Sequence, residues 1–466
     1  MNNSSNSKTN ILGTLPVSRL LVKFAIPSIV AMLVSSLYNM VDQIFIGNFV
    51  GSLGNAATNV AFPMSTLCLA TALAFGIGGA AAFNLENGAG NSESAGQYIG
   101  NALSMMLIVG VCLTVIAQLF MKPLLLFFGS PVDVLPYAIE YTRVTAIGFP
   151  FLIVSSGGGH LIRADGKPTV AMTCNLTGAI SNTILDALFV VVFRWGMFGA
   201  ALATVIGQIL AFGLVMYHIL HFKTVHLTLA HYIPRAAYAF RCVNLGMSQG
   251  FNQLAMMVVQ IVLNNSLKYY GSQSIYGENI PIAVVGVITK VNIIYFSFCI
   301  GLSQALQPIA SFNYGAKNFK RTKEAYIKAT MAGSVISIIA WIVFRTFPRQ
   351  LTSIFGQGSA EYFDFAIKYF RIYLFFTFVN NVQPLTSNFF SSIGKPIKGL
   401  FLSLTRQIIF LLPMILVLPL MMGIDGIMYA GPIADGLAFV VAVCFVIYEL
   451  RRPEYRMTIA GGENGQ

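Results

Sequence analysis

Charged residues are scarce in this sequence. Only 9% of its 466 residues are Asp, Glu, Lys or Arg, whereas 56% are hydrophobic. A water-soluble chain of this length would need far more charge to cover its surface, so lipid is the solvent that the composition fits. The apolar runs last about twenty residues or more, which favours helices over the shorter, alternating strands of a membrane barrel. We therefore predict an all-α polytopic membrane protein with about twelve transmembrane helices.

The sequence also shows no Cys-x-x-Cys pair and no evident cleavable signal peptide. The six cysteines form no Cys-x-x-Cys pair and lie almost entirely within apolar runs. We therefore expect apolar side chains at these positions, with no metal site and no disulfide framework. The histidines between His218 and His231 have no cysteine or carboxylate among them, which favours a solvated basic loop over a metal site. The first ten residues are polar, and the apolar run from Phe24 is too long for a signal peptide, so we expect no cleavable signal.

The net charge of +12 is distributed unevenly along the chain. If the N-terminus is cytoplasmic, most Lys and Arg residues outside the apolar runs fall in predicted cytoplasmic segments. The predicted external loops hold only Lys122, Arg194, Lys268, Arg345 and Arg349. This positive-inside pattern predicts a multi-pass protein of the cell membrane with both termini in the cytoplasm. The basic charge reflects topology, and we expect no nucleic-acid partner.

The two halves of the chain resemble each other. The sequence GAGN at positions 88–91 recurs as GAKN at 315–318, 227 positions later, and GKP at 166–168 recurs at 394–396, 228 positions later. Six spans in each half would place both copies in the same orientation, related by a pseudo-two-fold axis along the membrane normal, with a substrate site near their interface. The predicted division is a cytoplasmic N-terminal segment (1–23), an N-lobe (24–221), a cytoplasmic linker (222–243), a C-lobe (244–450) and a cytoplasmic C-terminal tail (451–466).

Few carboxylates lie well inside a predicted span. A charge at the bilayer centre costs at least about 2.5 kcal/mol, so a deep carboxylate needs a partner or a purpose. Asn182 precedes Asp186 by four residues and follows Asn175 by seven, so these three side chains share one helical face. Asp42 follows Tyr38 by four residues on the first span.

Carboxylate, amide and hydroxyl oxygens grouped inside a bundle suit a hard cation such as Na⁺, or a proton shared between two carboxylates. We predict a cation- or proton-binding site made by Asp42, Asn182, Asp186 and Thr204, with support from Tyr38 and Asn175. The alternative is that the two acids only tie helices together through hydrogen bonds.

The second half does not repeat these groups, so we place ion coupling in the first half. The deep charged residues of the second half are Lys290, Arg406 and Asp435. We assign them to substrate contact or to structure, with Lys290 as one candidate partner of Asp435. The glycine run at 157–159, directly before His160, predicts a break or hinge at the end of the fourth span.

The chain resembles the multidrug and toxic-compound extrusion (MATE) family at these residues. Ile26-Pro27, the segment from Tyr38 to Asp42, and Ile46-Gly47 are similar to the family's first helix, and RADGKP at 163–168 is similar to its loop before helix five. Asn182, Asp186 and Thr204 match the N-lobe cation site of prokaryotic members. The resemblance runs from about Phe24 to Leu450. Some members also place a Glu in helix seven, but residues 246–253 hold no acid here, so that coupling scheme is not implied.

The resemblance implies a two-lobed secondary active exporter, and not an enzyme. Such a protein alternates between outward-open and inward-open states, and inward movement of Na⁺ or H⁺ drives the efflux of amphipathic, often cationic, organic compounds. It implies a small-molecule substrate, a lipid environment, no cofactor and no metal beyond a coupling Na⁺. We expect a monomer.

Two alternatives stay open. A flippase for lipid-linked sugars, of the same superfamily, would favour a strongly cationic central cavity, for which Lys290 and Arg406 are candidates. An intramembrane enzyme would need a buried His with a carboxylate, or a Ser with a base, and the sequence offers no evident set of this kind.

Overall fold

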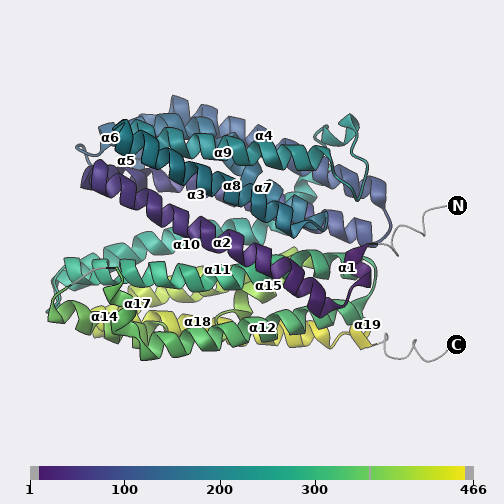
Figure 1. Ribbon diagram of the computed structural model, residues 1–466. Coiled ribbons are helices and arrows are strands. Elements are labelled where there is room, and N and C mark those ends of the chain that lie inside the picture. The colour runs from purple at the N-terminus through teal and green to yellow at the C-terminus, as the bar shows by residue number, and fades with distance from the viewer. Residues whose placement is uncertain (1–9, 356–357, 457–466) are drawn as a thin grey trace, which may run out of the picture.

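The computed structural model describes residues 10–355 and 358–456, and every regular element within these ranges is a helix. Figure 1 shows two bundles lying side by side, one built mainly from the first half of the chain and one from the second. The first and last described helices, α1 (Ile11–Thr14) and α19 (Pro453–Arg456), lie at the same end of the molecule. We call this the terminal end and the opposite one the far end.

The N-lobe contains six long helical elements. They are α2 (Val17–Phe49), α3 (Ser52–Gly88), α4 (Ser92–Leu119), the pair α6 (Leu135–Thr145) and α7 (Phe149–Ala164), α8 (Pro168–Asp186) with the π-helical segment Ala187–Val192, and α9 (Gly196–Leu220). A short helix, α5 (Met121–Phe127), connects α4 to α6. The predicted hinge at the glycine run is wrong, because α7 continues through it; the break in this span is the 3₁₀ turn Ala146–Gly148.

The C-lobe repeats this plan. Its elements are α10 (Ala236–Ser272), α11 (Asn279–Gly315), α12 (Phe319–Thr346), the pair α14 (Ala360–Tyr373) and α15 (Val382–Ser392), α16 (Pro396–Leu404) with the π-helical segment Thr405–Leu411 and α17 (Leu412–Met422), and α18 (Ile424–Leu450). Short α13 (Pro348–Ser353) precedes α14. Because α2 begins at Val17 and α10 at Ala236, helix occupies part of both the predicted N-terminal segment and the predicted linker.

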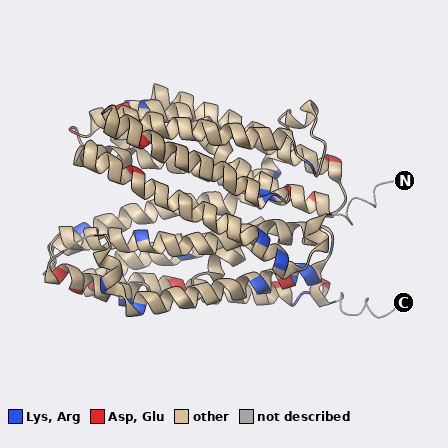
Figure 2. Cartoon of the chain, in the orientation of Figure 1, with Lys and Arg blue, Asp and Glu red and all other residues tan. Residues whose placement is uncertain are grey.

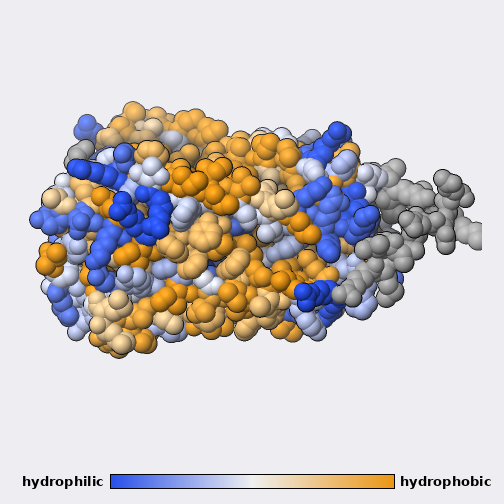
Figure 3. All heavy atoms as spheres, turned by 90° about the horizontal axis from the view of Figure 1, so that it is seen from below, coloured by the Kyte–Doolittle hydropathy of each residue, from blue (hydrophilic) through white to orange (hydrophobic). Residues whose placement is uncertain are grey.

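Ten of these elements, within the described residues, are long and apolar enough to cross a membrane. The α10 helix and the α14–α15 pair complete the predicted twelve. Helix α10 is long enough but less apolar than the ten, because it carries many amide side chains, and the α14–α15 span is interrupted around the 3₁₀ turn Thr377–Val379. Figure 3 shows an apolar band across the middle of the surface with polar ends, and in Figure 2 most charged residues lie toward these ends. The fold is therefore that of a polytopic membrane protein.

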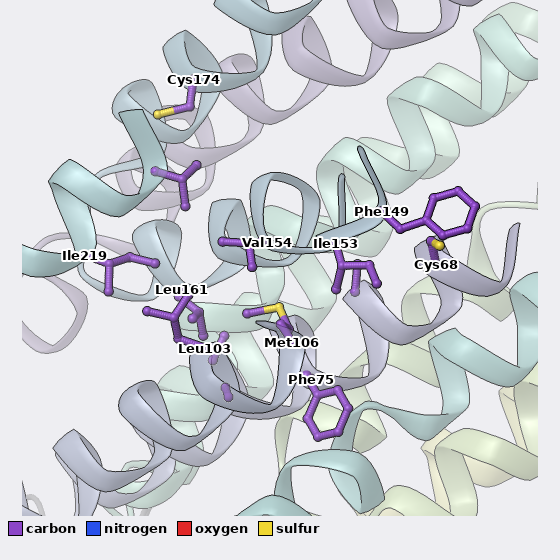
Figure 4. Packing of buried hydrophobic residues seen from close by; sticks show 14 of the residues in the cluster. Cys68, Phe75, Leu103, Met106, Phe149, Ile153, Val154, Leu161, Cys174 and Ile219 are labelled. Carbon is purple, nitrogen blue, oxygen red and sulfur yellow. The ribbon is translucent and has the colours of Figure 1, made fainter. Parts of the chain in front are cut away.

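The hydrophobic cores of the two lobes are built from different parts of the chain. Buried side chains of α3, α4, α7 and α9 interdigitate in the N-lobe, where Phe75, Met106 and Leu161 lie together (Figure 4). The C-lobe core includes α1 and the first half of α2, whose Leu20 and Phe24 pack with residues of α11, α15 and α18. Helix α2 thus crosses from one bundle to the other, as Figure 1 shows.

The lobes meet through glycines in the half of the molecule nearer the terminal end. A Cβ atom added at Gly78 of α3 would lie 1.7 Å from the carbonyl oxygen of Cys242 in α10. One added at Gly246 of α10 would lie 2.0 Å from the carbonyl oxygen of Ala74. No side chain fits at these positions, so the two backbones pack directly on each other.

A second glycine contact between the lobes is formed by residues that are equivalent in the sequence repeat. A Cβ atom at Gly88 would lie 2.1 Å from the carbonyl oxygen of Phe312, and one at Gly315 would lie 2.1 Å from that of Leu85. Gly88 and Gly315 are 227 positions apart, as are Leu85 and Phe312. The two halves of this contact therefore exchange under the pseudo-two-fold relation, which places the axis between α3 and α11.

We predict that Gly78→Ala and Gly246→Ala each destabilise the protein. Overpacking against backbone costs about 1–3 kcal/mol, which outweighs the roughly 1 kcal/mol that alanine gains over glycine inside a helix. The matched control is Gly213→Ala in α9, where an added Cβ meets nothing within 4 Å and which should unfold no earlier than wild type. Thermal unfolding in detergent measures the effect, and equal midpoints in all three variants would contradict a tight contact between the lobes.

Candidate functional site

Two carboxylates meet inside the N-lobe. Asp42 lies near the far end of α2, and Asp186 is the last residue of α8 before its π-helical segment. Their carboxyl groups lie within hydrogen-bonding reach of each other. Asp186 is fully buried, and one buried oxygen of each carboxyl group has no hydrogen-bond partner among the described residues. The structure thus brings together the two acids that the sequence placed on different spans.

Asn182 and Thr204 complete the group. In the amide orientation that satisfies both of its ends, Asn182 Nδ2 donates to Asp186 Oδ2 at 3.2 Å. Asn182 Oδ1 then accepts from the backbone N–H of Thr204 at 3.2 Å and lies 3.3 Å from the Thr204 hydroxyl oxygen. These hydrogen bonds hold the side chain of Asn182, which lies one turn before Asp186 on α8, against α9.

Two tyrosines lie beside the acids. Tyr38 of α2 is close enough to both carboxyl groups to interact with them electrostatically. Tyr141 of α6 is similarly placed and also adjoins the Thr204 side chain. Sequence reasoning missed Tyr141, because nothing in the sequence places α6 against α9; its one signal is a hydroxyl within an apolar span. Asn175 is half-buried two turns from Asn182, and its side chain makes no hydrogen bond within the described part of the chain.

The N-lobe group is suited to hold one positive charge. Two carboxylates at this separation repel each other when both are ionised, and a bound Na⁺ or one shared proton removes that repulsion. The hydroxyl oxygens of Thr204 and the tyrosines extend the set of hard ligands that Na⁺ prefers, whereas Asn182 turns its amide nitrogen toward Asp186. The described residues hold no cluster of three or more His, Cys, Asp and Glu side chains, so a transition-metal site finds no support there.

The C-lobe holds a different charged group. Arg406 Nε donates to Asp435 Oδ1 at 2.5 Å, and Asn380 Nδ2 donates to Asp435 Oδ2 at 3.0 Å. The suggested pairing of Asp435 with Lys290 is therefore wrong. Arg406 compensates the charge of Asp435, and both carboxylate oxygens accept a hydrogen bond. In the N-lobe, Asp42 and Asp186 each have an oxygen without a partner among the described residues. Arg406 lies within a π-helical segment, a local widening of the helix that is frequent at functional sites.

Lys290 faces the other lobe. Ser297, seven residues on, hydrogen-bonds Ser36 of α2 across 3.0 Å, and Gln304, another seven residues on, approaches Met32 at 3.6 Å. Helical spacing puts Lys290 on the same face of α11, two turns nearer the far end. It forms no ion pair within the described chain. Lys290 is thus a candidate for contact with a solute between the lobes.

We predict that Asp435→Asn destabilises the protein by about 3–5 kcal/mol, because it leaves the Arg406 guanidinium buried without a counter-charge. Adding Arg406→Gln should recover much of that loss, since the double variant buries no charge. The measurement is a double-mutant cycle of unfolding midpoints over wild type, both single variants and the double. Additive losses would mean that the two side chains do not depend on each other.

Comparison with known proteins agrees with this architecture. The MatE family model matches residues 27–188 and 250–417, one segment in each lobe. The multidrug export protein MepA of Staphylococcus haemolyticus is 22% identical over 95% of this chain and 95% of its own length. An FAD transporter of Shewanella oneidensis is 23% identical, covering 90% of this chain and 92% of its own.

Solved structures show the same fold. A multidrug resistance MATE family transporter of the MOP superfamily, in an outward-facing conformation, superposes with a TM-score of 0.86 at 23% identity, covering 93% of this chain and 96% of its own. The family model covers well over half of the sequence and falls on both halves of the repeat. The chain belongs to the MatE family of membrane transporters.

Proposed function

We propose that this protein is a secondary active exporter that exchanges Na⁺ or H⁺ for amphipathic, often cationic, organic compounds. The observation that carries the proposal is the uncompensated carboxyl pair of Asp42 and Asp186 inside the membrane-spanning part of the N-lobe. Ionisable groups at this depth belong as a rule to ion pathways. The names of relatives support export of organic compounds: several are multidrug export proteins, and one is an FAD transporter.

A bound ion would act on the position of α2. With both carboxylates ionised, repulsion pushes α2 away from α8; a Na⁺ or a proton between Asp42 and Asp186 draws the two helices together. The other half of α2 belongs to the C-lobe core, through Leu20 and Phe24. Pro27, inside α2, is a natural bend point between these two attachments. Ion binding in one lobe can therefore move the contact between lobes.

The geometry of the lobe interface supports alternating access. Ser36 and Ser297, near the middle of their helices, form the contact between lobes nearest the far end among the described hydrogen bonds. The glycine contacts lie nearer the terminal end, for which the distribution of Lys and Arg predicts a cytoplasmic location. Closure on this side is what an outward-facing state requires.

Exchange requires that the ion and the solute stabilise different states. A ligand with equal affinity for both states shifts nothing, however tightly it binds. We infer that occupancy of the carboxyl pair draws α2 toward α8 and lowers affinity for the solute between the lobes. The flippase alternative loses one of its two candidate cavity cations, because Asp435 neutralises Arg406.

The central prediction is that Asp42→Asn and Asp186→Asn each abolish ion-driven efflux while the protein still folds. Each substitution removes a charge at nearly constant volume. Because the two carboxyl groups bind the same ion or share the same proton, the double variant should be little worse than either single variant. The assay is efflux of a fluorescent organic cation from proteoliposomes, driven separately by a Na⁺ gradient and by a pH gradient.

The control is Asp133→Asn, which removes an exposed carboxylate of the same lobe and should transport normally. Near-normal gradient-driven efflux in both Asp42→Asn and Asp186→Asn would mean that the acids only brace the bundle. The two gradients also separate Na⁺ coupling from H⁺ coupling in the wild type.

A second prediction tests closure at the terminal end. Arg241 of α10 forms an ion pair with Glu86 of α3 across 3.0 Å, joining the lobes beside the glycine contacts. With Cys112 and Cys444, the two exposed thiols of the described chain, replaced by Ser, we introduce Glu86→Cys and Arg241→Cys. A short reducible bifunctional reagent should stop efflux, and reduction should restore it, because the lobes must separate at this end to load solute.

The control for this experiment is a cross-link within one lobe. Lys368 of α14 and Asp425 of α18 form an ion pair at 2.7 Å, with side chains exposed to a degree comparable with that of Arg241. Joining cysteines at these two positions should leave efflux unchanged. Full efflux with the Glu86/Arg241 cross-link in place would rule out opening between α3 and α10.

A further inference from the structure

A buried arginine lacks a partner in the N-lobe. Arg163, in the last turn of α7, is only 5% exposed. Its side chain makes no hydrogen bond and no ion pair within the described residues, and its Nε is enclosed without an acceptor. A guanidinium removed from water without a counter-charge is strongly unfavourable, so its place here calls for an anion that the chain does not supply.

The nearby carboxylates are already committed. Asp165 pairs with Lys167 and accepts hydrogen bonds from the backbone and hydroxyl of Thr224. Glu86, the one acid of α3, pairs with Arg241. Helices α7 and α11 contain no acid at all. Helices α3, α7 and α11 and the turn after α7 therefore offer no free negative charge to Arg163.

A second unpartnered polar group lies beside Arg163. His160, one turn before Arg163 and within electrostatic reach of it, adjoins Gln307 of α11 and has a buried Nδ1 without a partner in the described chain. His160 can donate to an anion in the tautomer or charge state that protonates Nδ1.

The glycine run of α7 leaves space beside the guanidinium. An added Cβ at Gly157 or Gly158 would lie 2.3 Å from a neighbouring side chain, so packing accounts for both. At Gly159, one turn before Arg163, it would meet only Arg163 Nη1 at 3.9 Å. Packing does not require glycine at 159, and its missing side chain leaves room at the tip of Arg163.

We propose that Arg163 and His160 form an oxyanion site that accepts a carboxylate or phosphate group. A planar guanidinium binds such groups through paired charge-assisted hydrogen bonds, and the imidazole supplies a further donor. Helix α7 belongs to the N-lobe, whereas Gln307, which adjoins His160, lies on α11 of the C-lobe, so the site opens when the lobes part at the terminal end. An anionic group of a solute or a free inorganic anion would enter from that side, whichever ion drives transport.

The test is thermal unfolding of the purified full-length protein in detergent, titrated with inorganic phosphate or with benzoate in exchange for chloride at constant sodium and ionic strength. Wild type should show a rise in midpoint that saturates with at least one of the two anions. Phosphate also stabilises proteins by exclusion from their surface, and Arg163→Gln should show only that unsaturable part. Without added anion, Arg163→Gln should unfold no earlier than wild type, because it removes an uncompensated buried charge.

Gly159→Ala keeps the charge and fills the space. It should unfold like wild type without anion, and its half-saturating anion concentration should rise by about tenfold, as expected for one lost charge-assisted hydrogen bond. Arg235→Gln, which removes an exposed cation of the linker, should respond like wild type. Saturation by phosphate identifies a free inorganic anion as sufficient, and saturation by benzoate alone assigns the site to carboxylate-bearing solutes. No saturable response in wild type, or the same response in wild type and Arg163→Gln, would overturn the proposal.

Discussion

The direct packing of backbone on backbone between the lobes is the constraint on which the rest of the structure depends. Gly78 and Gly246 allow α3 and α10 to touch without side chains, and Gly88 and Gly315 do the same for α3 and α11. Lipid tails are as apolar as leucine, so burial alone gives two helices in a membrane little reason to associate; close approach supplies the van der Waals contact instead. Because the contacts lie toward one end, the lobes are held together there and carry fewer restraints at the other.

Helix α2 connects the proposed ion site to this contact between the lobes. Its first half lies in the C-lobe core and its second half carries Asp42 against α8. A site built only from helices confined to one lobe would bind an ion without moving the other lobe. The carboxyl pair lies in the N-lobe, but α2 also packs in the C-lobe core, so a change in local charge at Asp42 can change the position of a helix that both lobes share, which is what the proposed exchange needs.

Composition and repeat were enough to predict the membrane class, the two lobes and the residues of the carboxyl pair. These signals are local or periodic: long apolar runs, and acids where a charge is unfavourable. What failed depended on contacts between distant segments. The partner of Asp435 is 29 residues away on another helix, and the sequence analysis named Lys290, not Arg406, as a candidate partner. The share of α2 in the C-lobe core and the position of Tyr141 beside the acids likewise follow from tertiary packing alone.

The two lobes share a frame and differ in how they balance buried charge. In the C-lobe, Arg406 neutralises Asp435 within the protein, so this group needs no ion and gains nothing from a gradient. In the N-lobe, Asp42 and Asp186 face each other without a cation from the chain, so their lowest free energy requires one from outside. Both groups lie at a π-helical segment of the fifth span of their lobe, so the difference comes from side-chain chemistry on the same scaffold. If a single site couples ion binding to transport, the uncompensated negative charge of Asp42 and Asp186 places that site in the N-lobe.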